Sequence, residues 1–203
     1  MIGPVRRNPS TVVVLTGKTS GPVLTALERS MNVVLVRSAE DADGLEAATA
    51  ALRRAAGISA PYVLVAADPL AAVAAEWSAM WDLAQENRGS ERFELRAGEA
   101  LAAWHANQFE LPDYYLVLAD ETATDERRPD FYLGPLRSVR PHRVAVAAAA
   151  EPAEQAAAVR SELGSLRAGR WWPSLEEVFR TVRGFYPGAL AESAEAGRAT
   201  LLA

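Results

Sequence analysis

We predict from the sequence an α/β fold of three layers, with helices on both faces of a mainly parallel sheet, an antiparallel edge and a helical C-terminal end. In the first half of the chain, short aliphatic runs alternate three times with helical segments, which is the pattern of parallel strands joined by right-handed crossovers. Half of the 203 residues are hydrophobic, which is enough for one large core. Because no repeat or linker interrupts this pattern, we expect a single domain over 1–203, with a polar lead-in at 1–10 and a weakly patterned tail at 187–203.

Each of the first three predicted strands is a continuous run of β-branched and aliphatic residues, which is typical of strands buried on both faces. The three runs lie at 11–16, 32–36 and 61–66. A helix is predicted after each strand, because apolar residues recur there every three or four positions. These helices lie at 23–29, 45–55 and 70–84. Pro22 suits the first turn of the first helix, and Gly57 suits the end of the second.

The second half of the chain predicts a less regular arrangement. Strands are predicted at 93–95, 114–119, 131–133 and 143–148, and helices at 99–107, 152–166 and 175–186. The connection between the strands at 131–133 and 143–148 is short and holds Gly134 and two prolines, so we expect these strands to pair antiparallel at a sheet edge. The highly charged segment 120–128 has no apolar periodicity and is predicted to be a surface loop.

Composition argues against several classes of function. The net charge of -5 disfavours broad electrostatic binding to nucleic acid or to an anionic membrane. The chain has no cysteine and only two histidines, so we expect no disulfide, no thiolate nucleophile and no metal site built on these residues. We find no run of about eighteen apolar residues that would span a membrane. Residues 1–10 lack the apolar centre of a signal peptide, so we expect a cytoplasmic protein.

The candidate ligand-binding residues are those that follow the predicted parallel strands, because the carboxyl ends of such strands meet at the edge where ligands usually bind. They are Gly17, Lys18, Thr19, Ser20 and Gly21 after the first strand, Arg37 and Ser38 after the second, Asp68 after the third and Asp120 after the fourth. The first group offers N–H groups at a helix start, two hydroxyls and the only lysine of the chain, which suits a phosphate. The alternative is that these glycines are purely structural and that the lysine is a solvated surface residue.

The spacing of the first glycine loop excludes one well-known phosphate site. Gly17-Lys18-Thr19 matches the end of the G-x-x-x-x-G-K-[ST] motif. The first glycine of that motif would fall at position 12, but Val12 stands there, inside the predicted strand. The chain has no room for the phosphate loop of a Walker A site, so we reject that interpretation.

A second motif gives a partial resemblance. The segment 16–21, Thr-Gly-Lys-Thr-Ser-Gly, resembles the T-G-x-x-x-G opening of short-chain dehydrogenase/reductases, and the likeness extends over about residues 11–73. It implies a Rossmann-like start that binds NADP or another nucleotide, with Arg37 near a 2′-phosphate and Asp68 near the adenine. Val23 replaces the third glycine of the motif. The family's Y-x-x-x-K catalytic pair is absent, because Lys18 is the only lysine, so the resemblance implies no reductase activity.

A competing hypothesis assigns the function to the aromatic C-terminal region. Trp171 and Trp172 precede the last predicted helix, where they either seat that helix in the core or form a surface for a protein partner or a homo-oligomer. The cluster Arg137, Arg140, His142 and Arg143 is interpreted as a solvated surface of mixed charge, with nucleic-acid binding as a third hypothesis. His105 is interpreted as an ordinary helix histidine.

Overall fold

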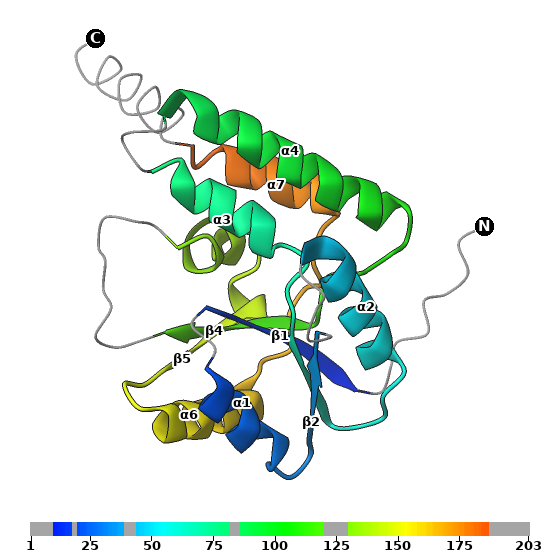
Figure 1. The fold of residues 1–203 in the computed structure, drawn as a ribbon, viewed down its shortest axis with the longest axis vertical. Helices are drawn as coiled ribbons and strands as arrows, with labels where there is room; N and C mark the ends of the chain where they lie inside the picture. Colours follow the sequence, from blue (N-terminus) through cyan, green and yellow to red (C-terminus); the bar gives the residue numbers. More distant parts are fainter. Residues whose placement is uncertain (1–9, 18–19, 39–43, 82–85, 120–129, 187–203) are drawn as a thin grey trace.

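The structure is a computed structural model that describes residues 10–17, 20–38, 44–81, 86–119 and 130–186, with only the backbone described at 86–89 (Figure 1). Several predicted features lie outside these residues. They are most of the lead-in, the C-terminal tail, the charged loop at 120–128 and the candidate residues Lys18, Thr19 and Asp120. Within the described residues, no helix combines the length and the apolar composition that are needed to cross a bilayer.

The centre of the fold is a five-stranded parallel sheet, which confirms the predicted α/β class. Its strands are β1 (Thr11–Gly17), β2 (Val33–Arg37), β3 (Tyr62–Ala66), β4 (Tyr114–Ala119) and β5 (Val144–Ala148). The order across the sheet is β2-β3-β1-β4-β5, and every neighbouring pair is parallel. β1 is the central strand, and Val13, Val14 and Leu15 are buried, as its continuous apolar run predicts.

Helices cover both faces of the sheet (Figure 1). α1 (Gly21–Glu28) and α6 (Pro152–Ser165) pack against each other and against one face. The other face carries α2 (Gly44–Ala56), α3 (Ala71–Ala79), α4 (Glu86–His105) and α7 (Leu175–Arg183). Side chains that alternate along β1 divide between the two cores: Val14 enters the larger one, whereas Val13 and Leu15 enter the smaller one.

The expected antiparallel edge is wrong, because β5 pairs parallel to β4. Residues 131–133 belong to a helical turn instead of a strand, since a π-helical turn spans Tyr132–Leu136. The Asp130 carboxylate accepts hydrogen bonds from the backbone N–H groups of Tyr132 and Leu133, which starts this turn. Phe131 and Tyr132 are both buried, as adjacent residues of a helical turn can be. The short helix α5 (Arg137–Val139) and a 3₁₀ turn (Pro141–Arg143) then lead the chain into β5.

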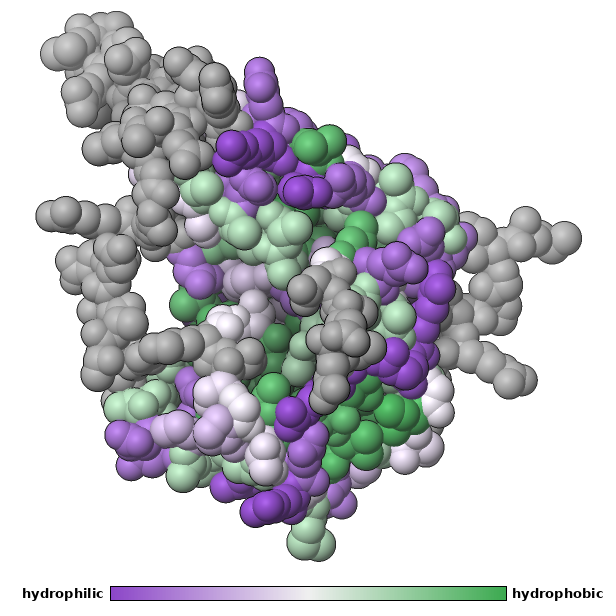
Figure 2. Space-filling view, viewed as in Figure 1, coloured by the Kyte–Doolittle hydropathy of each residue, from purple (hydrophilic) through white to green (hydrophobic). Residues whose placement is uncertain are grey.

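The segment 86–105 also differs from its prediction. A single helix, α4, replaces the short strand predicted at 93–95 and the helix predicted at 99–107. Its buried residues Phe93, Ala97, Ala100 and Ala103 recur every three or four positions, so they form one face that packs on α3 and α7. The outward face of α4 is mostly hydrophilic (Figure 2). The polar residues of this segment therefore form the solvent face of one long helix.

Candidate functional site

The order of the strands places a change of direction between β1 and β4. The chain leaves β1 through α1 and reaches β2 at one side of the sheet, whereas it leaves β4 and reaches β5 at the other side. Neighbouring parallel strands whose connections diverge in this way mark the usual ligand-binding position, beyond their carboxyl ends. The residues at the end of β1 are the predicted Gly17 loop.

Gly17 is required where β1 and β4 approach each other. Its φ is +88°, in the left-handed region that residues with a Cβ rarely adopt. A Cβ at this position would lie 2.5 Å from the carbonyl oxygen of Leu118 in β4. Gly17 is therefore structurally fixed, and it also leaves the carboxyl end of β1 free of a side chain.

Ser20 is the N-cap residue of α1, but its side chain makes no cap hydrogen bond. Its backbone is extended, with φ -112° and ψ 151°, as expected for an N-cap. The Ser20 hydroxyl is buried and has no hydrogen-bond partner within the described part of the chain. A buried hydroxyl normally has a partner, so the Ser20 side chain differs in this respect from most buried hydroxyl groups.

Two further candidate residues, Ser38 and Asp68, line one small pocket of about 170 Å³ beyond β2 and β3. The first turn of α2, from Gly44 to Ala48, and the approach to α3, from Pro69 to Ala72, form the rest of its wall. The structure thus brings together residues that the sequence places thirty positions apart, as expected for one edge of a parallel sheet.

The Asp68 side chain is half-buried in the wall of this pocket, and both of its carboxylate oxygens accept hydrogen bonds. Oδ1 accepts a hydrogen bond from the Leu70 N–H at 2.9 Å, and Oδ2 accepts one from the Tyr132 hydroxyl. Burial raises the pKa of Asp68 from 3.8 to about 6, while the bonds from Tyr132 and Leu70 act in the opposite direction. Burial and the nearby Asp68 charge raise the pKa of Tyr132 and of Tyr115 well above the usual value. Asp68 is therefore an acid that changes charge near neutral pH.

Arg37 does not join this pocket. Its Nε donates to Glu28 Oε1 at 2.9 Å, and both side chains are more than 40% exposed. Glu28 belongs to α1, which packs on the other face of the sheet from α2 and α3. The structure therefore pairs this candidate phosphate ligand with a carboxylate of α1.

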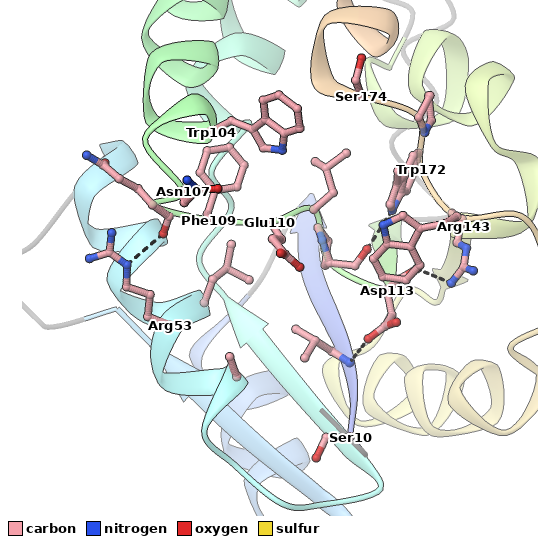
Figure 3. A pocket seen from close by; sticks show the side chains of 18 residues that line it. Ser10, Arg53, Trp104, Asn107, Phe109, Glu110, Asp113, Arg143, Trp172 and Ser174 are labelled. Carbon is pink, nitrogen blue, oxygen red and sulfur yellow. Dashed lines mark hydrogen bonds between the residues drawn. The ribbon is translucent and has the colours of Figure 1, made fainter. Parts of the chain in front are cut away.

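A second and larger cavity lies at the opposite end of the sheet, and sequence reasoning missed it. It measures about 740 Å³, and it is lined by the residues that precede three strands: Ser10 before β1, Asp113 before β4 and Arg143 before β5 (Figure 3). Trp171 and Trp172 also line it. The tryptophan pair was the one sequence signal for this cavity. Trp172 is buried and its indole N–H donates to the Pro112 carbonyl at 2.8 Å, whereas Trp171 is 39% exposed.

Arg143 is a structural residue, so the interpretation of its cluster as solvated surface is wrong at this position. The side chain is buried and donates three hydrogen bonds to carbonyl oxygens, those of Asp113, Gly169 and Arg170. Its guanidinium also lies 5.0 Å from the ring centroid of Tyr114 and 4.8 Å from that of Trp171.

Two other observations concern titratable groups. His105 Nε2 lies 2.5 Å from Glu176 Oε1, which links α4 to α7 at the surface. Among the residues that the structure describes, no three histidine, aspartate or glutamate side chains are grouped to hold a metal ion.

No protein-family model matches the chain, and no match was found among the curated proteins or the solved structures.

Proposed function

We propose that this protein binds a small phosphate-bearing ligand, such as a nucleotide, at the carboxyl edge of the sheet around Gly17–Gly21. One observation carries the proposal: the Ser20 hydroxyl is buried without a partner in the described structure, at the start of α1 and beside the β1–β4 change of direction. A phosphate oxygen at this position would accept its hydrogen bond and satisfy it.

The start of α1 has the physical properties that an anion needs. The first N–H groups of a helix have no intrahelical acceptor and carry the positive end of the helix dipole. Gly17 adds no side chain to the approach, because its Cβ position is taken by the neighbouring strand. In the sequence, Lys18 provides the one ammonium group of the chain within this loop. The N–H groups at the start of α1 and the Lys18 ammonium group both attract negative charge, and together they favour a phosphate.

The pocket of Ser38 and Asp68 suits a different part of the ligand. An ionised Asp68 would repel a phosphate there, whereas its carboxylate accepts hydrogen bonds from neutral donors. Ribose hydroxyls and the adenine amino group are donors of this kind. We therefore assign the phosphate to the start of α1 and the nucleoside portion to the pocket. NADP is one nucleotide of this class, and no reductase step is assigned, because the chain lacks a Y-x-x-x-K pair.

Thermal unfolding with NADP, ATP, S-adenosylmethionine and pyrophosphate tests the proposal. A ligand that binds the folded state at one hundred times its Kd adds about 2.7 kcal/mol of stability, so a bound nucleotide raises Tm measurably. We expect the rise to shrink in Lys18→Ala and Ser20→Ala and to persist in Ser165→Ala, a matched control at the exposed end of α6. An unchanged Tm with every phosphate compound would contradict the proposal.

The exposed Trp171 favours a second candidate function, that of a module for protein interaction or homo-oligomerisation. Its indole is 39% exposed, and exposed tryptophans are enriched at interfaces. Light scattering on the wild type and on Trp171→Ala tests this candidate. A concentration-dependent dimer that the substitution dissociates would support it, and a monomer at all concentrations would contradict a homo-oligomer.

A further inference from the structure

The cavity at the amino end of the sheet has the size and lining of a binding site for a small organic molecule. Its volume of about 740 Å³ lies within the range of about 300–1,000 Å³ that is typical of ligand pockets. It opens beside Ser10 and Asp113, which precede β1 and β4, whereas the Gly17 loop follows β1 at its other end. The cavity is therefore separate from the proposed phosphate site.

The walls of the cavity are largely apolar. Four aromatic side chains contribute to them. They are Trp104 from α4, Phe109 from the segment after α4, and the pair Trp171 and Trp172 from the segment before α7. Leu52 of α2 and Leu111 add aliphatic surface. A ligand that fits this lining has an apolar body, because that body removes the most apolar surface from water.

Two carboxylates enter the same cavity. Glu110 has no ion pair and no hydrogen bond to any described residue, and Figure 3 shows it between Phe109 and Asp113. Asp113 Oδ2 accepts a hydrogen bond from the Val12 N–H at 2.8 Å, which leaves its other oxygen without a hydrogen bond in the described structure. The acceptor capacity within the cavity is therefore largely unused.

The two arginines of the cavity wall are already engaged. Arg143 donates to three carbonyl oxygens and lies against two aromatic rings, so its guanidinium is not available to a ligand. Arg53 Nε donates to the Gln108 carbonyl at 3.0 Å, and Figure 3 shows Arg53 on the opposite side of the cavity from Asp113. Both guanidinium groups keep their positive charge, so the two arginines and the two carboxylates of the lining balance formally, and the hydrogen-bonding capacity that remains beside Asp113 is that of carboxylate oxygens.

We infer that this cavity binds an organic cation, a protonated amine or amidine carried on an apolar body. The cationic group lies between the carboxylates of Glu110 and Asp113, and the apolar body packs on Trp104 and Phe109. A cation near an aromatic face gains a further attraction to the ring. The inference does not depend on the proposed phosphate site.

Three ligands of similar size but different charge separate the effect of charge on affinity from the effect of size. They are 2-phenylethylamine, which is cationic, 2-phenylethanol, which is neutral, and phenylacetate, which is anionic. NMR titrations of the ¹⁵N-labelled protein, followed at the backbone N–H groups of 107–111 and of Asp113, measure their affinities. We expect the amine to bind about tenfold more tightly than the alcohol, because it gains charge-assisted hydrogen bonds, and we expect phenylacetate to bind most weakly. Equal affinities of amine and alcohol, preference for phenylacetate, or the absence of saturable binding by the amine would each overturn the inference.

Variants locate the charge. Glu110→Gln should weaken the amine about tenfold and leave the alcohol unchanged, because it removes one charge and preserves shape. Arg53→Gln should leave the affinity for the amine unchanged or raise it. Glu177→Gln, an exposed glutamate on α7 outside the cavity lining, is the matched control and should change nothing. Glu110 is exposed, so the Glu110→Gln variant should fold. If this variant binds the amine as tightly as the wild type does, the assignment of the charge to Glu110 is overturned.

Discussion

Replacing Asp68 with asparagine should remove a pH dependence from the stability of this protein. In the folded state the pKa of Asp68 is about 6, compared with 3.8 for the ordinary side chain, because its carboxylate is buried. The difference corresponds to about 3 kcal/mol, since each pKa unit is worth about 1.4 kcal/mol. Asparagine has the same shape and keeps an oxygen acceptor for the Leu70 N–H. The amide nitrogen takes the place of Oδ2, so the Tyr132 hydroxyl loses its acceptor there, and the cost of that loss does not change with pH in this range.

The direction in which stability changes with pH follows from the number of protons that the folded and unfolded states bind at Asp68. Between about pH 4 and pH 6 the folded state holds more protons at Asp68 than the unfolded state, so the free energy of unfolding falls as the pH rises. Below this window the carboxyl is protonated in both states, and above it the carboxylate is charged in both. The wild type should therefore lose about 3 kcal/mol relative to Asp68→Asn as the pH rises from about 3.5 to 7.

Urea unfolding of both proteins at intervals of half a pH unit measures this difference. Subtraction removes the contributions of other acids, such as Glu94, whose pKa is lowered mainly by its hydrogen bond from Arg183. A difference that stays constant with pH would refute the raised pKa of Asp68. A wild type that gains stability relative to the variant as the pH rises would show that the shift has the opposite sign.

Three further predictions concern single contacts, all measured by urea unfolding at constant pH. Gly17→Ala should lower the free energy of unfolding by at least about 2 kcal/mol, because φ is positive at Gly17 and the added Cβ would lie 2.5 Å from the Leu118 carbonyl oxygen. Gly21→Ala is the control. It should change the free energy of unfolding by less than about 1 kcal/mol, because no atom lies within 4 Å of the added Cβ. Without ligand, Ser20→Ala should leave the free energy of unfolding unchanged or raise it slightly, because the Ser20 hydroxyl makes no cap hydrogen bond. Ser174→Ala should lower the free energy of unfolding by about 1 kcal/mol, because the Ser174 hydroxyl caps α7. Equal losses in the two variants would contradict this account. Arg143→Lys should cost about 3 kcal/mol, because a lysine cannot serve three buried carbonyl groups in the same geometry, and a cost below about 1 kcal/mol would show that these bonds contribute little.

The features that the sequence predicted correctly are those determined by local patterns. The run at 11–16 predicted β1 because a strand covered on both faces is apolar at every position. The helix predicted to begin at 175 is α7, which begins at Leu175. Ser38 and Asp68 line one pocket because the carboxyl ends of β2 and β3 share one edge of the sheet, and their role in binding a ligand stays a prediction.

The features that the sequence missed depend on contacts between distant segments. Nothing in the pattern around Arg37 indicates its pairing with Glu28, which depends on how α1 packs on the sheet. The edge at β5 was misassigned because Phe131 and Tyr132 are apolar and aromatic, which suits a short strand as well as a buried helical turn. The large cavity combines segments near 10, 52, 110 and 172, so no single motif could predict it.

The most direct measurement of the central claim is an NMR titration of the ¹⁵N-labelled protein with NADP and with pyrophosphate. The account predicts saturable shifts at the amides of Gly17, Ser20 and Gly21 for both compounds, with further shifts at Ser38 and Asp68 for NADP alone. Shifts that are absent from 17–21 with both compounds, or that occur only at 107–113, would contradict a phosphate site at the carboxyl edge of the sheet.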